Sequence, residues 1–269
     1  MYPFAYHRPS SIEEAVALLA DPEAKALAGG QTLIPVLKQR LAMPEALVDL
    51  GRIESLKGIR REGDAVIIGA GTTHADVAAS PLVREALPAL ADLAGLIGDP
   101  QVRNRGTLGG SVANADPSAD YPAAVLGLGA TVHTDRRAIS ADDYFLGLFT
   151  TALEGGELVT AVSFAVAEVA AYRSVRNPAS GYAVAGVFVA RVGQGVRVAV
   201  TGAGPSAFRA TALEQALADS FTPEAARAVS WPEEGLNEDL HASPAYRAAL
   251  IPVLAARAVA ACCGTVASG

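Results

Sequence analysis

Cysteine is scarce in this chain, and its scarcity excludes several kinds of site. The 269 residues include two cysteines, Cys262 and Cys263, which are adjacent and close to the C-terminus. Two thiols cannot supply four thiolates to an iron–sulfur cluster, nor can they build a disulfide framework. The four histidines are scattered, and no pair has the spacing of metal ligands. We therefore expect no metal site on this chain, and we interpret the cysteines as small apolar residues at a helix end.

The sequence also lacks an excess of positive charge and a long apolar run. Its net charge of −7 argues against nucleic acid or an anionic membrane as the main partner. No uninterrupted apolar run approaches the roughly 18 residues of a membrane span, and the best stretch, which begins at Tyr182, reads as a buried strand. The N-terminus has no apolar signal core. We expect a cytoplasmic protein without a transmembrane segment.

The remaining composition is that of a folded globular protein. Hydrophobic residues make up 51% of the chain and charged residues 18%, which is too apolar for a disordered segment. The length allows one large domain or two smaller ones. We find no internal repeat and no low-complexity linker.

The first 165 residues alternate between helical and strand patterns. Ser10 or Ser11 can cap an amphipathic helix over residues 11–21, and a second helix is predicted over 34–41. Further helices are expected over residues 73–80 and 82–97. The segment GTLGGSVANA, residues 106–115, is predicted to be a glycine-rich loop with a short strand. The predicted strands begin at Ala24, Ala46, Ala65, Ala130 and Gly156.

The pattern of apolar and polar residues changes after about residue 165. YRSVRN, AVAGVFVARV and VRVAVTGAG alternate apolar and polar residues, and Gly193-Gln194-Gly195 joins the last two as a hairpin. From Thr211 onward the chain is alanine-rich and helical. We therefore predict a mixed α/β domain over residues 1–165, with two subdomains split near 55. A smaller domain of antiparallel sheet plus helices follows over 166–269.

Two glycine turns need a functional explanation. LAGGQTL, residues 27–33, and TLGGSVAN, residues 107–114, each follow a predicted strand or loop with small polar residues. Glycine lets a ligand approach the backbone closely, and free N–H groups at such turns bind anions, phosphate above all. Either turn alone reads as a tight surface turn. Together, with Thr32, Thr107, Ser111 and Asn114 beside them, they predict two N–H clusters that grip one pyrophosphate.

A third glycine segment resembles a dinucleotide fingerprint only in part. VIIGAGTTHADV follows a predicted strand and opens a helix, and Asp92 lies at a suitable distance downstream. However, His74 stands where the third glycine belongs, and without that glycine the helix packs less closely on its strand. This match is a weak indication of an NAD site.

Asp120 is the candidate acid for a nucleotide. It follows a loop of small residues and precedes Tyr121-Pro122, and a carboxylate can accept hydrogen bonds from ribose hydroxyls. The alternative is that Asp120 caps a helix or is a solvated loop acid. Asp116 is the competing carboxylate.

These motifs resemble those of the FAD-binding medium subunit of the molybdenum hydroxylases, the family of carbon monoxide dehydrogenase and xanthine dehydrogenase. The resemblance covers nearly the whole chain. It begins in FAYHRPSSIEEAVALLAD, continues through LAGGQTLIPVLKQRLAMPEALVDL and IGAGTTHADV, and is strongest in GDPQVRNRGTLGGSVANADPSADYPA. NPASGYAVAGV resembles the start of that subunit's C-terminal domain.

The resemblance implies an α+β fold: an FAD-binding domain of the vanillyl-alcohol-oxidase (PCMH) type, followed by the smaller C-terminal domain. AGGQT would wrap the FAD pyrophosphate, TLGGSVAN would line the same cofactor, Asp120 would hold its ribitol or ribose side, and Ile97 would pack near the isoalloxazine. Neither glycine turn contains histidine or cysteine, so we expect noncovalent FAD. The implied cofactor-binding residues are Ala28, Gly29, Gly30, Gln31, Thr32, Leu33, Ile97, Thr107, Gly109, Gly110, Ser111, Asn114 and Asp120.

One position departs from the family pattern. Related chains often carry a lysine near the start of the C-terminal domain, close to the flavin. The best-aligned residue here is Ser174, and either Arg173 or Arg176 is a candidate substitute.

The resemblance also implies partners. In the family, a large subunit carries the molybdenum cofactor and a small subunit carries two-iron iron–sulfur clusters, in a dimer of heterotrimers. This chain would be the electron-transfer subunit that passes electrons from those clusters to an external acceptor, and it has no catalytic residues of its own. Two alternatives remain: a self-contained FAD- or NAD-dependent oxidoreductase acting on a small organic substrate, and a non-catalytic nucleotide-binding or assembly module.

Overall fold

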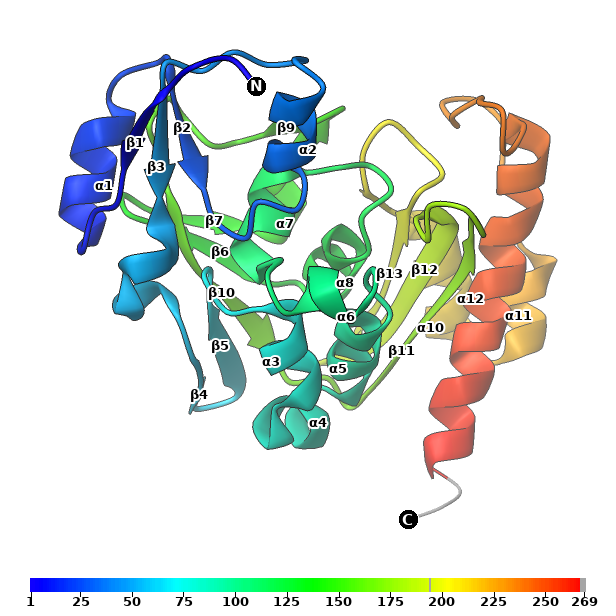
Figure 1. Cartoon of the computed structure of the whole chain (residues 1–269). Helices are drawn as coiled ribbons and strands as arrows, with labels where there is room; N and C mark the ends of the chain where they lie inside the picture. Colours follow the sequence, from blue (N-terminus) through cyan, green and yellow to red (C-terminus); the bar gives the residue numbers. More distant parts are fainter. Residues whose placement is uncertain (194, 267–269) are drawn as a thin grey trace.

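Among the described residues, three larger β-sheets succeed one another from the N-terminal to the C-terminal end of the sequence, and a separate two-stranded sheet accompanies them (Figure 1). The computed structural model describes residues 1–193 and 195–266. The predicted hairpin residue Gln194 lies outside the described residues, although its neighbours Val192 and Gly195 pair across the hairpin. The fold is a mixed α+β architecture, as expected.

The first sheet is parallel and places the first glycine turn at its carboxyl edge. Its strand order is β1-β3-β2, and the turn follows β2 directly. Helix α1 starts where predicted, because the Ser11 side chain accepts a hydrogen bond from the Glu14 N–H at 3.2 Å. The elements are β1 (Ala5–His7), α1 (Ile12–Leu19), β2 (Ala24–Leu27), α2 (Leu33–Lys38) and β3 (Ala46–Asp49).

The second sheet has the order β4-β5-β10-β6-β7, and its pairs are antiparallel. Strand β5 carries the partial dinucleotide fingerprint, so the parallel strand–helix–strand unit of a Rossmann site is not formed there. His74 instead begins helix α3 as a buried residue. The strands are β4 (Ile59–Glu62), β5 (Ala65–Gly69), β6 (Thr131–Thr134), β7 (Ala138–Ser140) and β10 (Val159–Ala165).

Short helices fill the connection between β5 and β6. The predicted long helix over 82–97 is two helices, because Pro88 starts the second one. The helices are α3 (His74–Ala79), α4 (Pro81–Ala86), α5 (Pro88–Gly95), α6 (Pro100–Arg103), α7 (Leu108–Asn114) and α8 (Tyr121–Gly127); α9 (Ala141–Tyr144) and the ribbon of β8 (Phe145–Gly147) and β9 (Thr150–Thr151) follow β7.

Helix α7 corrects the prediction of a loop and short strand over residues 106–115. Two glycines lower the intrinsic helix propensity of this segment, and that is why the pattern read as a loop. The Thr107 side chain nevertheless caps the helix by accepting a hydrogen bond from the Gly110 N–H at 3.1 Å. Ala115, at φ 45°, ends it in the left-handed conformation.

The third sheet is antiparallel, and long helix α12 lies against it (Figure 1). Its strand order is β11-β12-β13-β14, and the predicted alanine-rich helices are present. The elements are β11 (Val169–Arg176), β12 (Ala183–Val192), β13 (Gly195–Thr201), β14 (Phe208–Arg209), α10 (Thr211–Asp219), α11 (Pro223–Ala228) and α12 (Pro244–Val266).

Within the described residues, the stretch Pro244–Gly264 of α12 is long and apolar enough, by length and composition alone, to cross a membrane. Half of its apolar window is buried, and residues such as Ile251 and Val259 belong to the core of the third sheet. Arg247 and Arg257 divide the apolar residues of this helix, so it contains no uninterrupted apolar run of that length. The expectation of no transmembrane segment stays a prediction.

The hydrophobic core crosses from the second sheet to the third. One cluster of buried residues joins Leu108 and Tyr121 of α7 and α8 to Tyr172 and Phe188 of β11 and β12. The region of the second glycine turn therefore packs on the C-terminal sheet. The division into domains at residues 55 and 165 stays a prediction.

Candidate functional site

The two glycine turns, 80 residues apart in sequence, lie in direct contact. A Cβ added to Gly29 would lie 2.1 Å from the carbonyl oxygen of Arg105, and one added to Gly110 would lie 3.7 Å from the Ala28 Cβ. Only glycine at position 29 allows the backbones to approach this closely. The structure thus brings together the segments that the sequence predicted to share one ligand.

The first turn presents unengaged backbone donors. None of the N–H groups from Gly29 to Leu33 donates to a described protein atom, and Thr32 makes no side-chain cap at the start of α2. Gly30 adopts φ +73°, a conformation that favours glycine. Consecutive free N–H groups between a strand and a helix form a cradle for an anion. The predicted cluster of N–H groups is present here, and its binding of a pyrophosphate stays a prediction.

The N–H groups at the start of the second turn donate to other atoms of the chain, contrary to the expectation of a second free N–H cluster. Leu108 N–H donates to the Thr72 carbonyl at 3.0 Å and Gly109 N–H to the Ala70 carbonyl at 2.9 Å. The Gly110 N–H donates to the Thr107 hydroxyl. These bonds dock the start of α7 on the end of β5, so the second turn holds the site together rather than supplying a second N–H cradle.

Helix α7 nevertheless directs predicted residues toward the first turn. Gly110, Ser111 and Asn114 recur at helical spacing on one face, and Gly110 on that face lies beside Ala28. Ser111 and Asn114 are half-buried, and their side chains make no hydrogen bond to a described residue. Gly109 lies on the opposite, buried face, where an added Cβ would lie 2.4 Å from the Ala70 Cβ. The role of each residue toward a cofactor stays a prediction.

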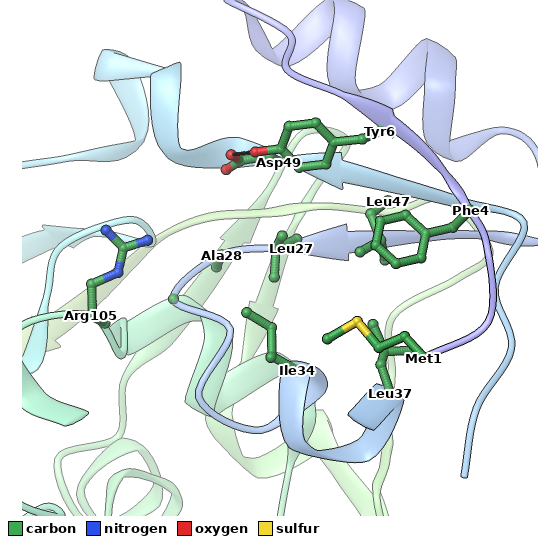
Figure 2. Close-up of a pocket in the computed structure, with 11 residues that line it drawn as sticks. Met1, Phe4, Tyr6, Leu27, Ala28, Ile34, Leu37, Leu47, Asp49 and Arg105 are labelled. Atoms are coloured by element: carbon green, nitrogen blue, oxygen red, sulfur yellow. Dashed lines mark hydrogen bonds between the residues drawn. The ribbon is translucent and has the colours of Figure 1, made fainter. Parts of the chain in front are cut away.

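A pocket of about 310 Å³ opens beside the first turn (Figure 2). Leu27 and Ile34 point into it from β2 and from α2, with Arg105 at one end and Phe4 at the other. Tyr6 donates a hydrogen bond to Asp49 on the pocket wall, and Arg8 forms an ion pair with the same carboxylate at 3.2 Å. The pocket is therefore an apolar space with a polar rim.

Sequence reasoning missed Asp49 and Arg105 as members of this region. The available signal for Asp49 was its place at the carboxyl end of a parallel strand, where ligands of parallel sheets commonly bind. The pKa of Asp49 is lowered from its usual value, because the Tyr6 hydrogen bond, the Gly51 N–H and the nearby Arg8 favour the ionised form over the opposing effect of burial. Nothing in the spacing pointed to Arg105, whose position depends on the contact between the turns.

Asp120 is buried, with 6% of its surface exposed, and its carboxylate is held by the third sheet. Oδ1 accepts hydrogen bonds from the Tyr172 hydroxyl at 2.5 Å and from the Arg176 guanidinium at 2.9 Å. Among the described residues, no donor reaches Oδ2. Burial raises the pKa of Asp120, and Arg176 and Tyr172 oppose that effect. Asp120 is the N-cap residue of α8, as the alternative of a helix cap expected, but its side chain makes no cap hydrogen bond there.

Asp116 has a local role. It accepts a hydrogen bond from the Ser118 N–H at 2.9 Å, which closes a turn of its own loop. Burial raises its pKa. Of the two competing acids, Asp120 is the one that contacts other elements of the fold.

Successive side chains of β11 point to opposite faces of the sheet, so the two arginines considered beside Ser174 lie on different faces. Tyr172, Ser174 and Arg176 face the Asp120 side of the strand, whereas Arg173 lies on the other face and its charge acts on Cys262 of α12. Arg176 is therefore the cation on the Ser174 face. Ile97, the predicted flavin neighbour, is half-buried and packs on the core cluster of α7 and α8.

The observed donor set fits a dinucleotide cofactor such as FAD. The free N–H groups of the first turn suit a pyrophosphate, the adjoining apolar pocket suits a planar ring, and the buried carboxylate of Asp120 suits a hydroxyl donor.

Residues 2–166 match the family described as "FAD binding domain in molybdopterin dehydrogenase". The chain is 39% identical to the carbon monoxide dehydrogenase medium chain of Hydrogenophaga pseudoflava, over 95% of this chain and 96% of that one. It is 37% identical to the nicotine 6-hydroxylase medium subunit of Paenarthrobacter nicotinovorans, over 94% of this chain and 95% of that one.

Solved structures give the same similarity. A chain of the Cu,Mo-CO dehydrogenase in its cyanide-inactivated form superposes with a TM-score of 0.87 at 36% identity, over 97% of this chain and 99% of that one. A chain of quinoline 2-oxidoreductase from Pseudomonas putida 86 gives a TM-score of 0.89 at 30% identity, over 98% of each chain.

Proposed function

This chain belongs to the FAD-binding medium subunits of the molybdenum hydroxylases, and from that premise we propose that it binds FAD noncovalently as the electron-transfer subunit of such a complex. It receives electrons from iron–sulfur clusters on a small partner subunit and delivers them to an external acceptor. When bound, FAD supplies the exchange between single-electron and two-electron chemistry. The protein supplies binding and orientation.

The observation that carries this proposal is the row of free N–H groups from Gly29 to Leu33 beside the second glycine turn. These groups bind the pyrophosphate, and the face of α7 with Ser111 and Asn114 covers the same part of the cofactor. Asp120 accepts a hydrogen bond from a ribitol or ribose hydroxyl through its free oxygen. Ile97 packs beside the isoalloxazine.

The partners follow from the same premise. A large subunit carries the molybdenum cofactor and the substrate site, and a small subunit carries two-iron clusters, in a dimer of heterotrimers in the cytoplasm. The two cysteines of this chain cannot hold those clusters. We expect this chain to copurify with both partners and, alone, to pass electrons from a chemical reductant to a dye without hydroxylating any substrate.

Acid precipitation of the purified chain tests the cofactor. FAD should pass into the supernatant, and yellow colour that stays in the pellet would indicate a covalent link instead. Substrate-dependent flavin reduction by the isolated, metal-free chain would favour the self-contained oxidoreductase.

Replacement of Asp120 tests the site. A hydrogen bond to a charged group is worth roughly 1.5–3 kcal/mol, so Asp120→Ala should weaken FAD binding by about 10- to 100-fold. Asp116→Ala is the control, because its carboxylate closes a local turn. Fluorescence titration of FAD into the apoprotein measures both, and equal affinities of the two variants would contradict the assignment.

A further inference from the structure

The loop that carries the proposed ligand acid is held by the C-terminal sheet. The Thr201 hydroxyl, at the end of β13, lies 2.9 Å from the Pro117 carbonyl and 2.6 Å from that of Ala119. The next residue, Gly202, donates its N–H to the same Pro117 carbonyl at 2.7 Å. The position of Asp120 is thus set from outside its own segment.

Strand β11 holds the carboxylate itself. Tyr172 donates to Asp120 Oδ1, and Arg176 donates to the same oxygen and, at 2.7 Å, to the Gly181 carbonyl. Both bonds fall on Oδ1, which turns Oδ2 away from these two donors. Burial raises the pKa of the Tyr172 phenol, so this hydroxyl keeps its proton and acts as the donor.

The neighbouring strand is shaped to admit the phenol. Gly186 on β12 pairs with Ser174 on β11, and a Cβ added to Gly186 would lie 2.2 Å from the Tyr172 hydroxyl oxygen. A strand interior ordinarily favours a β-branched or aromatic residue, and glycine there marks a close approach. Here the close approach is by the group that donates to Asp120.

We propose that Tyr172 is a positioning residue for the cofactor site, and that Gly186 provides the space that lets it hold Asp120. This inference rests on the proposed function, since it takes Asp120 as a cofactor ligand. The phenol fixes Oδ1, so that Oδ2 is presented to a hydroxyl of the cofactor. The C-terminal sheet thereby influences the affinity for FAD of a site whose free N–H donors lie in the turn that follows the first sheet's strand β2.

The test uses the full-length apoprotein and compares two buried tyrosines of the same core. Tyr172→Phe removes the donor to Asp120, and we expect FAD to bind about tenfold more weakly. Tyr144→Phe makes the same chemical change in the same core cluster, away from Asp120, and should leave FAD affinity within about twofold of the wild type. Thermal unfolding of each apoprotein separates a loss of positioning from a loss of fold.

A pH profile of FAD affinity provides a readout that a purely structural role would not move. The charged or titratable groups around Asp120 are Tyr172 and Arg176 of β11, Asp116, Tyr121 and Tyr182. Loss of the Tyr172 donor removes stabilisation of the carboxylate, so the acid limb of the profile should move to higher pH in Tyr172→Phe and stay in place in Tyr144→Phe.

Gly186→Ala supplies an independent variant. We expect weaker FAD binding from it as well, and a smaller additional loss when it is combined with Tyr172→Phe, because both changes act on one contact. If Tyr172→Phe binds FAD as the wild type does while Asp120→Ala does not, the positioning role is wrong and the proposed function stands. If the wild-type chain binds no FAD, or Asp120→Ala binds as tightly as the wild type, the proposed ligand role of Asp120 is overturned and this inference with it.

Discussion

In the first glycine turn the N–H groups from Gly29 to Leu33 have no acceptor among the described residues, whereas in the second turn Leu108 and Gly109 donate to Thr72 and Ala70. The two turns touch each other and have the same small, polar composition. Their difference comes from their neighbours. The second turn lies against the end of β5, whose carbonyls are available, while the first lies at the open edge of a parallel sheet.

The comparison shows that a glycine pair can serve a ligand or serve packing. In the first turn, Gly30 adopts a positive φ and Gly29 lies close to the Arg105 backbone, while the N–H groups have no acceptor among the described residues. In the second, the missing side chain at Gly109 lets α7 rest on Ala70. We expect substitutions in the second turn to act mainly on stability, and substitutions in the first to act mainly on cofactor affinity.

Gly109→Ala should have the largest effect. The added Cβ would lie 2.4 Å from the Ala70 Cβ and 2.8 Å from its Cα, and a backbone atom cannot move aside cheaply. Overpacking of this kind costs about 3 kcal/mol, which corresponds to a fall in Tm of roughly 6–12 °C. Thermal unfolding of the apoprotein measures it.

Gly110→Ala is the matched control for this prediction. Its Cβ would meet the Thr107 hydroxyl at 2.9 Å and otherwise nothing closer than Ala28 at 3.7 Å, so the loss should stay within about 1 kcal/mol, the scale of one helix cap. Equal losses in the two variants would show that the face toward Ala70 is not the tightly packed one.

Acidification should weaken the second turn through His74. This buried side chain lies against Gly106, and the backbone N–H of His74 donates to the Gly106 carbonyl at 2.9 Å. Burial, with Arg103 nearby, lowers its pKa to about 4 from an ordinary value of 6.5. The unfolded chain then binds a proton that the folded chain does not, so stability is fully present above pH 6.5 and falls as the pH drops toward 4.

The expected loss is up to about 3 kcal/mol at pH 4, and about 2 kcal/mol at pH 5. His74→Phe removes the titrating group, and its unfolding free energy should change less between pH 7 and pH 5 than that of the wild type. The carboxylates with lowered pKa values, such as Glu157 at about 2, titrate mainly below this window. An unchanged slope in the variant would assign the pH dependence to other groups.

Much of the fold was predictable because its signals are local. Ser11 caps α1, strand β2 begins at Ala24 as predicted, and the change to alternating apolar and polar residues after about residue 165 marks the third sheet. Helix α7 was missed, because its cap and its packing on Ala70 outweigh the low propensity of two glycines.

Of the candidate site, the sequence pointed to the glycine turns and to Asp120 but not to the residues that contact them. The partner of Asp120, Tyr172, is 52 residues away, and the alternation of β11 says which side chains share a face but not what they meet. The acceptors of the second turn, Ala70 and Thr72, are also distant in sequence from the donors Gly109 and Leu108. Whether an N–H group is free depends on such distant carbonyls, so composition alone could not distinguish the two turns.

Gly30→Ala should have a smaller effect on stability than Gly109→Ala and a clear effect on the cofactor. A non-glycine residue at φ +73° costs about 1–2 kcal/mol, and the added Cβ would meet the flexible Ile34 Cδ1 at 2.6 Å. The same strain turns the N–H groups of the cradle away from a bound pyrophosphate, so FAD should bind about tenfold more weakly.

Gly63→Ala is the matched control, since Gly63 also has a positive φ, of +58°, and has open space around it in the β4–β5 turn. It should show a similar loss of stability in thermal unfolding and unchanged FAD affinity in the fluorescence titration. If Gly30→Ala bound FAD as tightly as Gly63→Ala, the first turn would be a structural turn like the second, and the distinction between them would fail.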